Sequence, residues 1–520
     1  MSESKSSASR QIARASGVVM VGFILSSLMG LISQMLITRA FGTSAEIDAF
    51  TAGNRLTELI FNLMAGGALA SAFVPTFTSF LTRNQTQRAW RLASSIASLL
   101  FVGLGIVCAL AGLAAPWLVK TILAPGFDTA QQALTVSLLR VMLISPVIFS
   151  LSGLVMGILN GYQRFFLPAI ASGCYRIGLA IGVIFLSPRM GIFGLAWGVV
   201  LGACLHLIVQ LPGLFSLGGH FFRGFGLDSP AVRQVGGLMV PRLVGQAVVQ
   251  VNFLVSTILA SGMSEGSLAA ISFAFMLMLM PQTIIAKAVG VASLPTFSIQ
   301  VARGEMEAFK DTLTTTFRGI VFLSLPASIG LILLRQPIVA MLFERGLFTA
   351  ESTALVAWAL LWFAVGLVGH SILEVIVRAF YAMFDTRTPV TVGVIAMSLN
   401  VVFSFVFAAV FSRLGYPPHG GLALANSLAT GLEVIALVLL IRKRLGALGF
   451  RRIQKGIVGS ATASAVMAGC LWLWTGVTAG ASVWVSGVGG AILGMAVYWV
   501  LAYLMGVPEA RQLPRMILNR

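Results

Sequence analysis

Long apolar runs dominate this sequence and leave few folds open to it. We count about fourteen runs of roughly 20 residues or more, without the alternation of apolar and polar residues that membrane β-strands require. A bilayer offers the backbone no hydrogen-bond partners, so runs of this length are expected to cross it as α-helices. With 58% hydrophobic and 10% charged residues, a soluble chain of 520 residues could not bury its apolar surface. The predicted fold class is therefore all-α, a polytopic membrane protein.

The expected spans follow one another closely along the chain. They cover about 17–39, 45–81, 92–118, 131–160, 166–187, 192–217, 234–261, 267–301, 314–335, 351–382, 388–412, 419–441, 456–477 and 482–506. Several exceed what a hydrocarbon core of about 30 Å needs, so we expect them to tilt, bend or project beyond it. The four cysteines lie inside apolar segments, which indicates buried thiols rather than a disulfide framework.

The basic residues are divided unevenly between the two sides of the membrane. If the N-terminus is cytoplasmic, 22 of the 34 lysines and arginines fall in cytoplasmic segments, 6 in outer segments and 6 in or at the ends of spans. An excess of positive charge inside is the usual pattern for membrane proteins. We therefore expect both termini in the cytoplasm. The net charge of +18 reflects topology, and no nucleic acid is expected as a partner.

The chain also repeats itself at an interval of 220 residues. ASAFVPTF (70–77) has a counterpart in VASLPTF (291–297), and GFDTA (126–130) has one in GLFTA (346–350). Six expected spans separate the copies, so both copies share one orientation. Two parallel six-helix lobes around a central cavity, with two appended helices, are a known transporter architecture. The predicted domains are 1–218 for helices 1–6, 219–445 for helices 7–12, and 446–520 for helices 13–14 with a basic tail.

Polar residues interrupt the second expected span at helical spacing. Thr51, Arg55, Glu58 and Asn62 are separated by three or four residues and so fall on one helical face. An uncompensated charge at mid-bilayer costs about 2.5–3.5 kcal/mol on insertion scales, so this face is expected to line a cavity or contact protein. Arg55 and Glu58 are close enough to form a structural ion pair. In the functional alternative, Arg55 binds a phosphate while Glu58 and Asn62 orient it.

Further charges are expected inside later spans. His370, Glu374 and Arg378 follow one another at intervals of four residues on the tenth span, where structural pairing and a gating or coupling role are both open. Glu433 on the twelfth span has no obvious partner in the sequence. A bound proton or cation would lower the free-energy cost of placing its carboxylate in the membrane. Lys287 on the eighth span has the same sign as the arginine of the second span. Two such cations could hold a pyrophosphate between the lobes, or Lys287 could pair with a carboxylate.

Signatures of enzymatic chemistry are not apparent in the sequence. There is no cysteine or histidine cluster at metal-binding spacing, no phosphate-binding loop and no nucleotide fold. We therefore expect a transporter and not an enzyme, with no metal and no cofactor. Its energy would come from an ion gradient, from the membrane potential or from consumption of the product, and the sequence does not identify a coupling ion.

Six motifs resemble those of one transporter family. They are FGTSAEIDAF (41–50), AFVPTF (72–77), LAPGF (123–127), LFERGLFTAEST (342–353), RAFYAMFDTRTPV (378–390) and GGLALANSLA (420–429). With these motifs the chain resembles the MurJ/MviN flippases of the multidrug/oligosaccharidyl-lipid/polysaccharide exporter superfamily. The motifs occur in order from the first span to the twelfth, and the chain length fits fourteen helices.

The resemblance implies a function, a location and partners. The expected activity is movement of lipid II, a polyprenyl-pyrophosphate-linked peptidoglycan precursor, from the inner to the outer leaflet by alternating access. The expected location is the bacterial cytoplasmic (inner) membrane. A lipid-linked substrate, membrane lipids and cell-wall synthesis proteins are the expected partners. Asp48 matches an acidic residue of the family and Arg55 keeps a basic group. The candidate substrate-binding residues are thus Asp48, Thr51, Arg55, Glu58, Asn62 and Lys287.

The chain departs from the family pattern where cavity charges are expected. Uncharged residues stand at these places: Ser27, Ser33 and Gln34 in the first span, Phe61 and Gly66 in the second, Phe273–Met276 in the eighth, and Ser256 in the seventh. Two alternatives therefore stay open. One is an exporter of the same superfamily with another amphipathic or oligosaccharide-lipid cargo. The other is a transport-dead scaffold for cell-wall synthesis.

Overall fold

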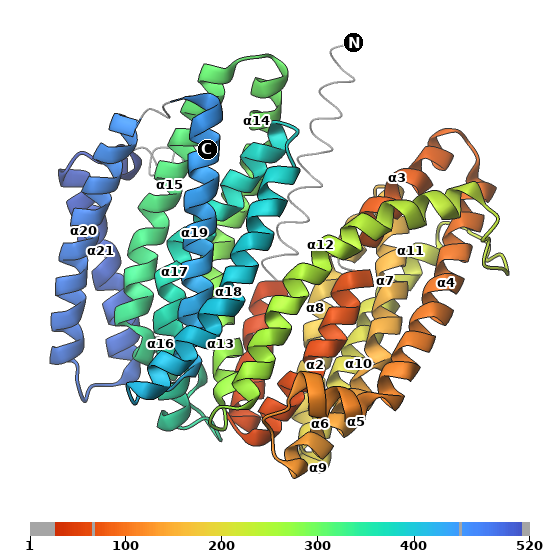
Figure 1. Ribbon diagram of the computed structural model, residues 1–520, viewed down its shortest axis with the longest axis horizontal. Helices are drawn as coiled ribbons and strands as arrows, with labels where there is room; N and C mark the ends of the chain where they lie inside the picture. The colour runs from red at the N-terminus through yellow and green to blue at the C-terminus, as the bar shows by residue number, and fades with distance from the viewer. Residues whose placement is uncertain (1–25, 65–67, 447–449, 512–520) are drawn as a thin grey trace. The chain divides into compact units, whose positions relative to one another are not determined.

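A computed structural model of the chain describes residues 26–64, 68–446 and 450–511, and it is helical throughout (Figure 1). No β-strand occurs in these ranges, which confirms the predicted fold class. The residues fall into two compact units. Unit 1 comprises the chain up to Glu265 together with Arg345–Leu347, and unit 2 comprises Gly266–Glu344 and the chain from Phe348 onward.

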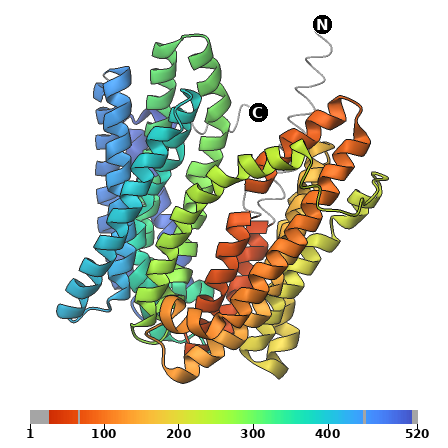
Figure 2. The same cartoon turned by 45° about the vertical axis from the view of Figure 1, so that its right-hand side comes forward.

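Unit 1 is built from short and long helices joined by tight turns. A helix over 26–41 is followed by α2 (Ala45–Met64), α3 (Ala68–Thr82), α4 (Thr86–Leu113), α5 (Ala115–Leu118), the π-helix η1 (Val119–Leu123), α6 (Thr129–Met142), α7 (Ile144–Gly161), α8 (Phe166–Ile181), η2 (Gly182–Leu186), α9 (Ser187–Met190), α10 (Ile192–Ile208), α11 (Leu211–Phe215) and α12 (Pro230–Ser261). Figures 1 and 2 show α12 running beside α2 and α3, with which it packs. The seventh expected span thus belongs, by its contacts, to unit 1.

Unit 2 contains the remaining helices. These are α13 (Ser267–Gln282), η3 (Thr283–Lys287), α14 (Ala288–Ala302), α15 (Met306–Leu333), α16 (Arg335–Phe343), α17 (Ala350–Ala382), α18 (Arg387–Arg413), α19 (His419–Leu445), α20 (Phe450–Val477), η4 (Val485–Gly489) and α21 (Gly490–Leu504). The main core lies among α14, α15, α17 and α19 and includes the fully buried Phe297, Phe309 and Phe380. A second core joins α15 to α20 and α21, where Tyr498 donates a hydrogen bond of 2.7 Å to the Phe322 carbonyl.

A buried ion pair attaches the end of the chain to α15. Arg318 lies 2.6 Å from Glu509, and the two side chains are 14% and 10% exposed. Removing one partner of such a pair is costly because it leaves the other charge buried and unpaired. This contact places the last described residues of the chain against unit 2.

Helix boundaries in the two units follow the sequence repeat. Helix α14 ends 220 residues after α3, and the two helices contain prolines at the same interval, Pro75 in one and Pro295 in the other. The next helices, α4 and α15, keep the same interval at both ends. The repeat therefore extends well beyond the two short motifs that revealed it. The arrangement as two parallel six-helix lobes stays a prediction.

Eleven helices in the described ranges are long and apolar enough to cross a membrane. The three expected spans that are not among them correspond to residues 26–41, to α2 with α3, and to α12. Charged residues in α2 lower its hydropathy, and residues 17–25 of the first expected span lie outside the described part. With these three helical regions the chain matches the expected number of about fourteen.

Candidate functional site

The polar face predicted for the second span forms on α2. Arg55 Nη1 lies 3.1 Å from Glu58 Oε2, and Asn54 Nδ2 donates a hydrogen bond of 2.9 Å to Glu58 Oε1. Thr51 Oγ1 donates to the Ile47 carbonyl of its own helix at 2.7 Å. These side chains and Asn62 are half-buried. The arginine and the glutamate therefore pair, as the structural interpretation predicts, without being removed from solvent.

The surroundings of Arg55 leave part of its guanidinium unused. The group lies over the ring of Phe253 on α12, with 5.3 Å between the guanidinium carbon and the ring centroid. Its Nε atom is buried and has no hydrogen-bond partner among the residues that the structure describes. The Arg55 side chain is 18% exposed and that of Glu58 is 47% exposed. An arginine held on an aromatic face with a free N–H can accept an anionic ligand, and phosphate matches its donor geometry.

Asp48 lies at the start of the same helix in a different environment. Its side chain is almost fully buried, at 2% exposure, seven residues before Arg55. Its backbone N–H donates to the Ser44 carbonyl at 3.1 Å, in the first turn of α2. Asp48 is therefore far more buried than the Arg55–Glu58 pair, and its predicted role in substrate binding stays a prediction.

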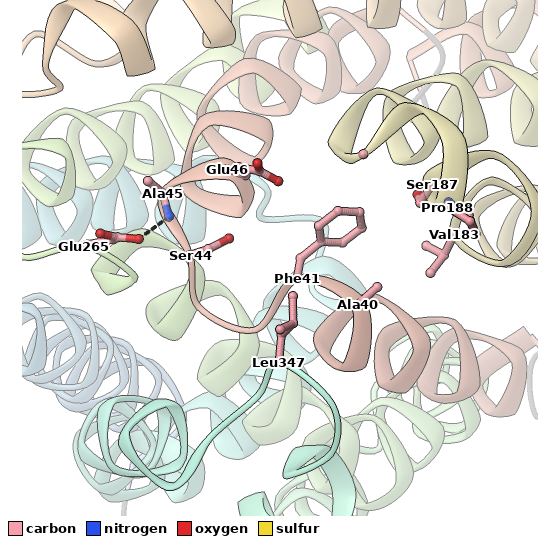
Figure 3. A pocket seen from close by; sticks show the side chains of 11 residues that line it. Ala40, Phe41, Ser44, Ala45, Glu46, Val183, Ser187, Pro188, Glu265 and Leu347 are labelled. Carbon is pink, nitrogen blue, oxygen red and sulfur yellow. Dashed lines mark hydrogen bonds between the residues drawn. The ribbon is translucent and has the colours of Figure 1, made fainter.

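Two of the sequence motifs meet at a pocket at the start of α2 (Figure 3). The pocket encloses about 540 Å³ and is lined by Phe41 and Glu46 from one motif and by Leu347 from the other. Leu347 N donates to the Arg39 carbonyl at 3.0 Å. Figure 3 shows Glu265 accepting a hydrogen bond of 2.7 Å from Ala45 N, which satisfies a free N–H at the helix start. These motifs thus have a structural role, because they pack together around the start of α2 in unit 1.

The stripe predicted on the tenth span is present on α17 in unit 2. Arg378 Nη1 lies 2.5 Å from Glu374 Oε2 and also donates to the Glu374 carbonyl. The same guanidinium packs against Gly290 of α14. His370 Nε2 lies 3.0 Å from Asn426 Oδ1 of α19. Arg378 is therefore held by its own helix and by α14, as expected for a structural pair.

Glu433 and Lys287, also in unit 2, differ from the paired residues. The half-buried Glu433 carboxylate faces Gly393 of α18, and no lysine, arginine or histidine nitrogen lies within 4 Å of it among the described residues. Lys287 is the last residue of η3 and is exposed. Their predicted roles stay predictions. Among the described residues, no carboxylate oxygen lies within 4 Å of the Lys287 ammonium group.

The further partners of the Arg55–Glu58 pair, and a buried hydrogen-bond network in unit 1, were not evident from the sequence. Asn54 and Phe253 were not singled out, although Asn54 precedes Arg55 and is four residues from Glu58, a spacing that places side chains together. In the network, His206 Nδ1 lies 2.6 Å from Ser152 Oγ. Gln210 Nε2 donates to the same hydroxyl at 2.8 Å.

Comparisons with known proteins agree on one family. The family model described as lipid II flippase MurJ matches residues 37–489. A lipid II flippase MurJ of Burkholderia cenocepacia is 30% identical over 473 residues, which covers 88% of this chain and 90% of that protein. A probable lipid II flippase MurJ of Rhizobium tropici is 29% identical and covers 92% of each chain.

Solved structures show the same fold. A lipid II flippase MurJ in an inward closed conformation aligns with a TM-score of 0.80 at 22% identity, covering 94% of this chain and 98% of that one. An inward-facing multidrug resistance MATE family transporter of the MOP superfamily aligns with a TM-score of 0.69 at 17% identity, covering 81% of this chain and 95% of that one.

Proposed function

The chain belongs to the MurJ family, and from this premise we propose that it moves lipid II from the inner to the outer leaflet of the cytoplasmic membrane, in peptidoglycan synthesis. The family match extends across residues 37–489, so it includes both units and not only one conserved segment. The relatives are named lipid II flippases, and this chain covers about nine-tenths of their length. The multi-pass helical architecture fits this activity.

The observation that supports a substrate site is the state of Arg55. This guanidinium lies inside a span and over Phe253, and its Nε has no partner in the described part of the chain, so it offers a donor to an incoming anion. A lipid-linked pyrophosphate presents the acceptor oxygens that such a planar donor set binds in pairs. We assign Arg55 to the pyrophosphate, and Glu58, with Asn54, to the orientation of the guanidinium.

The other candidate residues take secondary roles in this proposal. Thr51 and Asn62 extend the polar face of α2 toward the sugar part of the headgroup, and Asp48 fixes the start of the helix. Lys287 is a further cationic contact for the substrate. For gating of the transporter or coupling to an ion, the candidate residues are Glu374, Arg378 and Glu433.

The direction of transport follows from charge and topology. We place both termini in the cytoplasm, since 22 of the 34 basic residues then lie on that side. An anionic headgroup that moves outward is driven by an inside-negative potential, with about 2.3 kcal/mol per charge per 100 mV. No cofactor is needed for this step. Cell-wall synthesis proteins that consume the product in the outer leaflet would shift the transport equilibrium further outward. Glu433 is the group on which a coupling ion would act.

Substitutions of Arg55 test the proposed site. Flipping of lipid II by the purified chain in proteoliposomes should fall by about 10- to 100-fold in Arg55→Ala, because hydrogen bonds to charged groups contribute about 1.5–3 kcal/mol. Arg55→Lys should keep part of the activity, and Glu58→Gln should have a milder effect. Arg83→Ala, which removes an exposed arginine of the α3–α4 turn, is the matched control and should flip normally.

The purely structural interpretation of the ion pair makes the opposite prediction. If Arg55 only neutralises Glu58, Arg55→Ala leaves a carboxylate without its partner and lowers the melting temperature. The double variant Arg55→Ala/Glu58→Ala would then restore both stability and transport. Normal flipping by the double variant would remove Arg55 from the substrate site.

A second candidate function is export of another amphipathic cargo or oligosaccharide-linked lipid. Two positions where the family pattern has charges are occupied by packed aromatic rings: Phe61 lies 4.8 Å from Phe149, and Phe275 lies 5.2 Å from Phe363, between ring centroids. The structural similarity to a multidrug transporter is in line with this alternative. A chain that transports another lipid-linked sugar in the same vesicles but not lipid II would establish it. A chain that transports neither would support the scaffold alternative.

A further inference from the structure

An open groove runs along the outside of unit 1 between α4 and the α6–α7 pair. It has a volume of about 620 Å³ and is lined by apolar side chains, including Phe101, Ile106 and Ile148. Figure 1 shows α4 beside α7, with α5 and α6 at one end of the pair. Glycines form part of its surface: a methyl group added at Gly105 would meet no atom within 4 Å. The groove is therefore wide enough for an aliphatic chain.

One end of the groove holds a single cation, Arg140. Its Nε donates a hydrogen bond of 3.0 Å to the Gly112 carbonyl, in the last turn of α4. This contact satisfies one free carbonyl at a helix end, where a positive charge is also favourable. Within the described ranges it engages one of the five N–H groups of the guanidinium, and the side chain is exposed.

No acidic residue of the surrounding helices neutralises Arg140. Between Thr86 and Gly161 the sequence contains one acidic residue, Asp128. Its carboxylate accepts a hydrogen bond of 2.7 Å from Gln131 N at the start of α6, roughly 18 Å along the helix from Arg140. No carboxylate among the described residues lies within 4 Å of the Arg140 guanidinium.

Neighbouring residues place this end of the groove near the membrane surface. Trp117 follows α4 by four residues and is 60% exposed, and Lys120 follows one turn later and is also exposed. Tryptophan is enriched at the boundary between hydrocarbon and headgroups, and lysine reaches out of it. Arg140 thus lies at the depth of lipid phosphates, while the apolar part of the groove extends into the hydrocarbon.

We propose that this groove binds one anionic diacyl phospholipid, with an acyl chain over Gly105 and the phosphate on Arg140. The groove supplies apolar area for the chain, and the guanidinium supplies charge and donors for a phosphate. The site is separate from α2 and Arg55, so it represents a bound lipid and not the transported substrate. If the groove does not bind this lipid, the proposed flipping activity is unaffected.

Lipid retention by the full-length purified chain, measured by native mass spectrometry, tests the proposal. With phosphatidylglycerol added, we expect one retained molecule, and none with diacylglycerol of the same acyl chains. Arg140→Gln should lower retention about tenfold, the factor that corresponds to loss of a charged hydrogen bond. Gly105→Leu should lower it to a similar extent because the side chain fills the groove while Arg140 stays in place.

Two matched variants separate the groove from general effects. Gly103→Leu adds the same side chain to an exposed position of α4 that does not line the groove, and Arg413→Gln removes an exposed arginine from unit 2. Both should retain phosphatidylglycerol as the unmodified chain does. Equal retention by Arg140→Gln and the unmodified chain, or equal loss in the two glycine variants, would overturn the proposal. Preference for a polyprenyl phosphate over phosphatidylglycerol would overturn the assignment to a diacyl lipid.

Discussion

Asp385 shows how one residue explains a sequence motif. In the segment FYAMFDTRTP, its carboxylate accepts hydrogen bonds from Thr388 Oγ1 at 2.6 Å and from Thr388 N at 2.9 Å, and lies 2.5 Å from Arg444 Nη1 of α19. The Thr388 bonds, followed by the Arg444 charge, hold the pKa of Asp385 at about 2. The residue therefore caps α18 and ties its start to the end of α19.

Replacing Asp385 by alanine should reduce stability in a pH-dependent way. We expect a loss of about 1–2 kcal/mol in free energy of unfolding at pH 7, the usual range for a helix cap. Because the folded pKa lies below the ordinary value of 3.8, the stabilisation is complete above pH 4 and is lost as the pH falls toward 2. Thermal unfolding of both proteins at pH 7, 5 and 3 measures the difference, which should narrow only at pH 3.

Asp228 provides the control for this residue. Its fully exposed side chain lies 3.9 Å from that of Arg233, which is 72% exposed. Surface pairs of this kind contribute little, so Asp228→Ala should unfold within about 0.5 kcal/mol of the unmodified chain at each pH. An effect as large as that of Asp385→Ala would contradict our account of the cap.

At the scale of elements, glycines determine how closely α8 and α10 approach. Gly178 and Gly182 are four residues apart, and they face Gly198 and Gly202 on the partner helix. A methyl group added at Gly182 would lie 2.5 Å from Gly198 Cα, and one at Gly178 would overlap the backbone of Gly202. Small residues at this spacing allow membrane helices to pack through their backbones.

Gly178→Ala should therefore lower the free energy of unfolding by about 1–3 kcal/mol, the usual cost of overpacking. Gly173→Ala lies on the same helix, where an added methyl group meets no atom within 4 Å, and should be neutral or stabilising by up to about 1 kcal/mol. The melting temperatures of both variants in the same detergent test this prediction. Equal melting temperatures would show that α8 and α10 can separate at no cost.

For the whole molecule, the charge distribution predicts which loops face the cell exterior. Cysteine placed at the exposed Pro125, in a background without native cysteines, should react with a membrane-impermeant maleimide in intact cells. A cysteine at Phe221, which is 66% exposed between α11 and α12, should react only after permeabilisation. The reason is the excess of basic residues on the cytoplasmic side. The reverse labelling pattern would invert the topology and the proposed direction of transport.

The sequence alone determined the features that depend on local or periodic constraints. The bilayer imposes a minimum apolar length on every span, so the run lengths identified the membrane helices and the fold class. The polar face of α2 followed from helical periodicity, and the proximity of Arg55 to Glu58 followed from their spacing. The repeat predicted matching helices, and α4 and α15 match at both ends.

Only the tertiary structure decided which distant residues meet. Phe253 lies under Arg55, Glu265 caps α2, and Glu509 pairs with Arg318, although nearly 200 residues or more separate each pair. Single side chains leave no periodic trace of such partners, because contact between separate helices depends on their packing. For the same reason the groove beside Arg140 could not be predicted from the sequence, because it is formed by the packing of α4 against α6 and α7.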